Sequence, residues 1–88
     1  MMTTTAQTEI LETLANMSAD RTGYISLTSL RIELDHLDRA TVDAELTEMA
    51  MYGRIALIRN DNTAELSRRD HEAALELGGN PRHLVRIR

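Results

Sequence analysis

Three histidines and the carboxylates next to them are the side chains of this 88-residue chain that could do chemistry. His36 lies between Asp35 and Asp38, which offers nitrogen and oxygen donors of the kind that bind divalent metals. Their spacing follows no zinc pattern, and Asp38 is placed to cap a helix, so we expect no metal here. His71 is expected on a solvated helix surface, whereas His83 lies in an Arg-rich stretch, where phosphate contact is the alternative to a plain surface position.

Nothing else in the sequence predicts catalysis. The chain has no cysteine, which excludes disulfides, thiolate zinc sites and cysteine nucleophiles. It has no Gly-rich phosphate loop, no nucleophile elbow and no recognisable pair of catalytic acids, so we expect neither an enzyme nor a cofactor. The apolar runs are too short to span a membrane and the first residues lack a signal pattern, so we expect a cytoplasmic protein with no membrane partner.

The formal net charge of −4 is spread unevenly along the chain. Residues 1–50 carry three Arg against nine acids, which gives −6, and residues 51–88 carry seven Arg against five acids, which gives +2. The total charge argues against a strong non-specific binder of polyanions. Because Tyr24 and Tyr52 are the only aromatic residues, the core of the single expected domain, 1–88, must be aliphatic, and dimerisation would help to stabilise it.

Apolar periodicity predicts two helices in the first third of the chain. The first places four residues on one core-facing stripe: Ile10, Leu11, Leu14 and Met17. A loop at 18–23 and a very short strand at 24–25 are expected to follow. The second helix has Ser26 or Thr28 as its N-cap and faces the core with three residues: Leu27, Leu30 and Leu34.

A third helix is predicted over residues 39–52. The Asp38 carboxylate is expected to accept hydrogen bonds from its free N–H groups, and Gly53 is expected to end it. Its core-facing arc contains Val42, Leu46, Met49 and Ala50. Residues 54–59 then read as a strand, with a turn at 60–62 and the partner strand at 63–66.

The remaining residues predict one more helix and a tail. Ser67 and Asp70 resemble a capping box, and the helix after them is expected to be lined by Ala73, Ala74 and Leu77. Gly78-Gly79 would end this helix, Asn80-Pro81 would form a turn, and residues 83–87 would form a short extended tail.

The run LTEMAMYGRIALI, from Leu46 to Ile58, resembles the junction between the recognition helix and the wing of bacterial winged helix-turn-helix regulators. The resemblance covers roughly residues 5–66. It implies an α+β, mainly α fold with a three-helix core, a two-stranded wing at 54–66 and an additional C-terminal helix followed by a basic tail within 67–88. In such proteins the third helix lies in the major groove, the wing lies near the backbone, and an added helix often dimerises or docks.

The resemblance implies a small transcriptional regulator that binds double-stranded DNA. Arg39, Thr41 and Thr47 would then lie nearest the bases. Thr28 would contact the backbone from the second helix, and Arg59 and Asn62 would lie near phosphate on the wing. The acidic residues on the same helix oppose this assignment, since carboxylates near phosphates weaken binding.

A protein partner is the alternative. Ala40, Ala44, Thr47 and Met51 form a stripe of small residues and Met with an acidic rim, which suits a docking face. Arg82 and Arg86 could pair with an acidic face of a second subunit, so a homodimer or another protein partner is expected. This alternative is a winged-helix interaction or dimerisation module without DNA binding. A four-helix α domain, in which residues 54–66 form a loop, also remains open.

Overall fold

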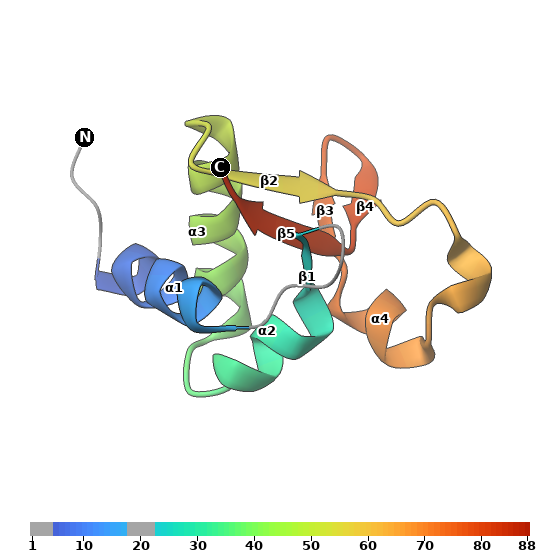
Figure 1. Ribbon diagram of the computed structural model, residues 1–88, viewed down its shortest axis with the longest axis horizontal. Coiled ribbons are helices and arrows are strands. Elements are labelled where there is room, and N and C mark those ends of the chain that lie inside the picture. The colour runs from blue at the N-terminus through green and yellow to red at the C-terminus, as the bar shows by residue number, and fades with distance from the viewer. Residues whose placement is uncertain (1–4, 18–22) are drawn as a thin grey trace.

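The computed structural model describes residues 5–17 and 23–88 (Figure 1). Its elements follow in this order: α1 (Thr5–Asn16), β1 (Ile25–Ser26), α2 (Leu27–Glu33), α3 (Arg39–Met51), β2 (Ile55–Ile58), the 3-10 helix η1 (Thr63–Glu65), α4 (Arg68–Ala73), β3 (Leu75–Leu77), β4 (Asn80–Arg82) and β5 (Leu84–Ile87). Within the described ranges this is an α+β chain with four α-helices and short antiparallel strands. The predicted loop at 18–23 lies outside these ranges apart from Gly23.

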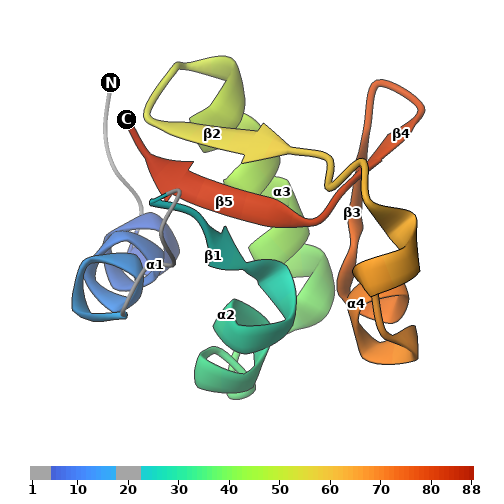
Figure 2. The same ribbon diagram turned by 45° about the vertical axis from the view of Figure 1, so that its right-hand side comes forward.

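The three-stranded sheet has its last strand in the middle. The strand order is β1-β5-β2, and both pairings of β5 are antiparallel. Val85 stands opposite Ile25 on one side and Leu57 on the other, and it is completely buried. In Figure 2, β5 runs between its two neighbours while α3 crosses behind them.

Local signals set the limits of α2 and α3. The Ser26 side chain caps α2 by accepting from the Ser29 amide at 3.1 Å, as predicted. Asp38 is the N-cap residue of α3, but its carboxylate makes no capping hydrogen bond, so that part of the prediction was wrong. Gly53 follows the end of α3 with φ +75°, and the Arg54 amide donates to the Met49 carbonyl at 2.9 Å, which closes the helix as expected for a C′ glycine.

The core is aliphatic, as the composition requires. Most of the predicted inward residues of the first three helices are buried in it: Ile10, Leu14, Leu27, Leu30, Leu34, Val42, Leu46 and Met49. The other three, Leu11, Met17 and Ala50, are partly buried and pack against it. The sheet adds Ile25, Ile55, Leu57 and Val85, and the segment before β4 adds Ala73 and Leu75. The core therefore extends beyond residue 66, where the sequence-based boundary of the core was drawn.

The predicted partner strand at 63–66 is wrong. Residues 63–65 form η1, and the strand beside β2 is β5. The physical reason is burial: Leu66 is the one bulky apolar residue between 63 and 66 and is only partly buried, whereas β5 contributes the completely buried Val85 and the partly buried Leu84. Residues 59–83 are consequently an insert between two neighbouring strands, and they project from the side of the sheet away from α1 in both views (Figures 1 and 2). The basic tail of the prediction is the central strand.

The predicted fourth helix is too long. Ser67 and Asp70 form the expected capping box, but α4 ends at Ala73, and Leu75–Leu77 is a strand. The turn lies at Gly78 and Gly79, whose φ values of +64° and +80° suit a two-residue hairpin. Asn80 and Pro81 therefore begin β4 instead of forming a turn.

The four-helix α alternative is also wrong, because β2 pairs with β5 along its whole length.

Candidate functional site

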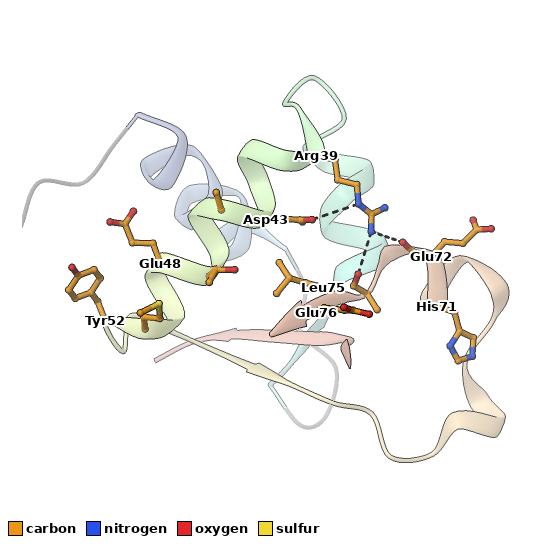
Figure 3. Close-up of a pocket in the computed structure, with 12 residues that line it drawn as sticks. Arg39, Asp43, Glu48, Tyr52, His71, Glu72, Leu75 and Glu76 are labelled. Carbon is orange, nitrogen blue, oxygen red and sulfur yellow. Dashed lines mark hydrogen bonds and ion pairs between the residues drawn. The ribbon is translucent and has the colours of Figure 1, made fainter. Parts of the chain in front are cut away.

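A surface groove of about 930 Å³ runs between α3 and the segment formed by α4 and β3 (Figure 3). Its volume lies at the upper end of the roughly 300–1,000 Å³ range of ligand pockets. The residues of α3 and its C-terminus that line it are Arg39, Asp43, Ala44, Thr47, Glu48, Met51 and Tyr52. The residues of the insert that line it are His71, Glu72, Ala74, Leu75 and Glu76.

Arg31 holds α2, α3 and the end of α4 together. Its Nη2 lies 2.6 Å from Asp43 Oδ1, and its Nε donates to the Ala73 carbonyl at 2.8 Å. The Arg31 side chain is only 14% exposed, so these bonds are shielded from water and are stronger than those of a surface pair. The insert is therefore attached to the helical core through a guanidinium.

Arg39 closes one end of the groove. Its Nη2 donates to the Glu72 carbonyl at 2.7 Å and to the Ala74 carbonyl at 3.3 Å, as drawn in Figure 3. Its Nε lies 3.8 Å from the Asp43 carboxylate, which Arg31 also contacts. Arg39 thus joins the first turn of α3 to the connection between α4 and β3.

The groove combines apolar surface with negative charge. Ala44 and Met51 supply exposed apolar atoms, and Met51 is 78% exposed, whereas the Leu75 side chain borders the groove but is only 2% exposed and belongs to the core. Four carboxylates and one guanidinium line it, which gives the lining residues a formal charge of −3 with His71 neutral. Asp43 and Glu72 are paired with Arg31 and Arg68, which do not line the groove. Glu48 and Glu76 therefore carry the negative charge that no cation among the described residues balances. Of these carboxylates, that of Glu76 has no hydrogen-bond or ion-pair partner among the described residues.

Two of the residues predicted to contact DNA hold the insert instead. Thr28 Oγ1 donates to Asp70 Oδ1 at 2.6 Å, and Arg39 makes the carbonyl contacts described above. Both side chains connect α2 or α3 to the segment that covers them. The Thr28 hydroxyl and the Nη2 of Arg39 are therefore engaged within the chain, and the Arg39 side chain is 54% exposed.

Of the other four predicted DNA contacts, only Thr47 lies at the groove. Thr41 is exposed near the start of α3, and Thr47 lines the groove. Arg59 and Asn62 follow β2 and do not line the groove. Arg59 Nε lies 3.7 Å from the Asp61 carboxylate, and the Asn62 amide donates to Asn60 Oδ1 in a turn.

The residues predicted for a protein interface divide in the same way. Ala44 and Met51 line the groove, whereas Ala40 is exposed but lies outside it. Arg82 is partly buried in β4, with Nη2 3.5 Å from the Leu77 carbonyl. Arg86 lies on the sheet, where its guanidinium is 5.0 Å from the centre of the Tyr24 ring.

The rings of His71 and His83 lie edge to face with their centres 6.2 Å apart, whereas His36 lies beside α1. His36 Nε2 contacts the Glu9 carboxylate of α1. In the described part of the chain, no three His, Asp or Glu side chains form a group suited to a metal. Over the same residues, none of the helices has both the length and the apolar character needed to cross a bilayer.

Asp70 and His83 hold the root of the insert against the sheet. Asp70 accepts from Thr28 Oγ1 and from the Ser67 amide, and these hydrogen bonds lower its pKa. His83 is buried, and its Nδ1 accepts from the Asn60 amide at 3.1 Å. Burial lowers the pKa of His83, and the neighbouring His71 and Arg59 lower it further. An accepting Nδ1 requires a neutral ring that carries its proton on Nε2.

We expect the unfolding free energy to decrease as the pH falls below about 6.5, the ordinary pKa of histidine. Unfolded His83 takes up a proton near that pH, whereas folded His83 does so only at lower pH, so acid favours the unfolded chain. Urea unfolding at pH 7.5, 6.5 and 5.5 measures this slope. The slope should be smaller in His83→Gln, and a flat profile in the unsubstituted protein would contradict the assignment.

Leu75 and Glu76 were not predicted to belong to a site, because the sequence predicts a helix over these residues. One signal was available: Leu75-Glu76-Leu77 alternates, and the Gly-Gly pair after it is typical of a hairpin. With a strand at that position, the acidic residue between two leucines would have been expected at a sheet edge.

Comparison of the chain with protein families, with curated proteins and with solved structures gave no match in any of the three.

Proposed function

We propose that this chain is a winged-helix module that binds a protein partner in the groove between α3 and β3. The partner segment presents apolar side chains together with Arg or Lys. The observation that carries the proposal is the acid-lined, partly apolar groove on the outer face of α3, where no cation among the described residues balances the carboxylates of Glu48 and Glu76.

The winged-helix assignment is supported by the order of the elements. The chain runs through α1, β1, α2, α3 and β2 and, after the insert, through β5, which pairs antiparallel with β2. The strand order of this sheet is β1-β5-β2. The wing of such a domain connects the second and third strands of its sheet, which in the three-stranded sheet of this chain are β2 and β5. In this assignment, the insert at 59–83 is a long wing that turns back along α3.

A protein partner is favoured over DNA by charge and by the occupation of polar groups. A phosphate backbone brought to the outer face of α3 would meet the carboxylates of Glu48, Glu72 and Glu76, which lowers affinity. Arg39 and Thr28, which would have supplied donors, are bonded to the insert. A cationic segment gains from the same carboxylates, and the exposed Met51 and Tyr52 give it apolar contact area.

The proposal is tested by NMR titration of the labelled protein with a capped cationic heptapeptide, Leu-Arg-Leu-Arg-Leu-Arg-Leu. We expect the largest shift changes at Ala44, Thr47 and Leu75, and about tenfold weaker binding by Glu76→Arg, which reverses a charge at the groove. Glu12→Arg makes the same change of charge on the exposed side of α1 and should alter the affinity less than about twofold. No binding, or equal effects of the two variants, would refute the groove.

DNA binding is the competing outcome. A mixed-sequence duplex at low salt should cause no saturable shift in the protein spectrum. If it does bind, with a salt dependence that Arg59→Ala flattens, the chain is a DNA-binding protein and the proposal above is wrong. A second copy of the chain as the partner would appear as concentration-dependent shifts of the same groove residues without any peptide.

A further inference from the structure

Within residues 5–17 and 23–88, no strand pairs with the outer edge of β3. β3 pairs with β4 alone, in the register Leu77 with Asn80, Glu76 with Pro81 and Leu75 with Arg82. Across a two-residue turn the flanking residues form a hydrogen-bonded pair, and such pairs alternate with non-bonded pairs. The pair of Glu76 with Pro81 is therefore non-bonded, so the N–H and C=O of Glu76 point away from β4.

This edge borders the groove. Ala74, Leu75 and Glu76 line the groove, whereas no residue of β4 does, which places β3 between the groove and β4. In Figure 3, Leu75 and Glu76 lie across the groove from the labelled residues of α3. Among the described residues that line the groove, the carbonyls of Glu72 and Ala74 both accept from Arg39. Glu76 stands at a non-bonded position of the β3-β4 pair, and its backbone makes no hydrogen bond with the described residues outside that pair.

We infer that the partner binds as an extended strand that adds to the free edge of β3. This inference rests on the proposed docking function and specifies its geometry. The segment exchanges both backbone hydrogen bonds with Glu76, and alternate side chains then lie on opposite faces of the added strand. Side chains on one face contact the exposed Ala44 and Met51, and basic side chains on the other reach the Glu76 carboxylate and the acidic rim.

Charge and volume agree with this occupant. A groove of about 930 Å³ is large enough to take the side chains of a short extended segment beside α3. Exposed strand edges in proteins are normally blocked by charge or by covering elements, and the charge at this edge is that of Glu76. A basic segment removes that obstacle, whereas an acidic segment is repelled, so the edge selects its partner by charge.

The first test compares two peptides of the same composition in the NMR titration. Leu-Arg-Leu-Arg-Leu-Arg-Leu has the alternation of a strand, and Leu-Arg-Arg-Leu-Leu-Arg-Leu has a helical pattern of the same residues. We expect the alternating peptide to bind about tenfold more tightly and the Glu76 amide to become protected from hydrogen exchange. If neither peptide perturbs the groove, the docking function fails. If the helical pattern binds as well as the alternating one, the docking function stands and strand addition fails.

The second test removes backbone donors on each side. In a scan of singly N-methylated alternating peptides, we expect a loss of about tenfold or more where the methylated amide faces β3, and a change of less than about twofold at its immediate neighbours. A uniform response along the peptide would overturn strand addition.

On the protein, Glu76→Pro removes the outward N–H at an edge where proline is compatible with the β3-β4 pair, and it should weaken binding more than Glu76→Ala. Equal affinities of these two variants would also overturn strand addition. If Glu76→Pro disturbs the hairpin, the scan of N-methylated peptides on the unsubstituted protein decides the question instead.

Discussion

Replacing Val85 by Asp is expected to abolish cooperative folding of the whole domain. Val85 is completely buried at the centre of the sheet, between Ile25 and Leu57, where a carboxylate finds neither water nor a partner. Burying an unpaired charge costs several kcal/mol, and an 88-residue domain has about 4–13 kcal/mol of stability in total. Circular dichroism with urea unfolding measures the effect. The milder Val85→Ala should lose about 2 kcal/mol and remain folded.

The matched control lies three residues further along the chain. Arg88→Ala changes an exposed side chain and leaves the backbone bond from the Arg88 amide to the Arg54 carbonyl in place. Its unfolding free energy should stay within about 0.5 kcal/mol of the unsubstituted protein. A folded, cooperative Val85→Asp protein would contradict the central position of β5 and would support the short extended tail that the sequence predicts at 83–87.

Replacing Arg31 by Leu is expected to detach the insert from the helical core. The change removes the bond to the Ala73 carbonyl and leaves Asp43 with only the more distant Arg39. Loss of a largely buried guanidinium of this kind should lower the unfolding free energy by about 2–3 kcal/mol. Amide hydrogen exchange should accelerate most in residues 68–82, because these are connected to α2 and α3 through Ala73 and Ala74.

Two further variants make the Arg31 result specific. Arg68→Leu removes a guanidinium that is 92% exposed and bonded to Glu72 one turn away, and should cost less than about 0.5 kcal/mol. Arg31→Lys keeps the charge but lacks the planar fork that reaches Asp43 and Ala73 together, so it should retain only part of the stability. If Arg31→Leu lowers global stability without faster exchange in the insert, Arg31 is not what attaches the insert.

The candidate site was predictable in part. The outer face of α3, with Ala44, Thr47 and Met51, follows from the 100° advance of a helix once its buried side is known. The opposite wall of the groove was not predicted, because Leu75 and Glu76 were assigned to a helix. That wall changes the chemistry of the face, since it adds two carboxylates and engages the Nη2 of Arg39.

The sequence by itself determined the elements whose signals are local. Apolar spacing identified the buried faces of the first three helices, Ser26 and Gly53 marked helix ends, and the Ser67–Asp70 capping box began α4. Only the tertiary structure decided which strand stands beside β2. Two segments compete for that place, and the choice depends on which of them buries more apolar surface against a core built from distant residues. Because the strand that contains Val85 pairs with β2, residues 59–83 lie outside the three-stranded sheet. The groove forms where this insert lies beside α3.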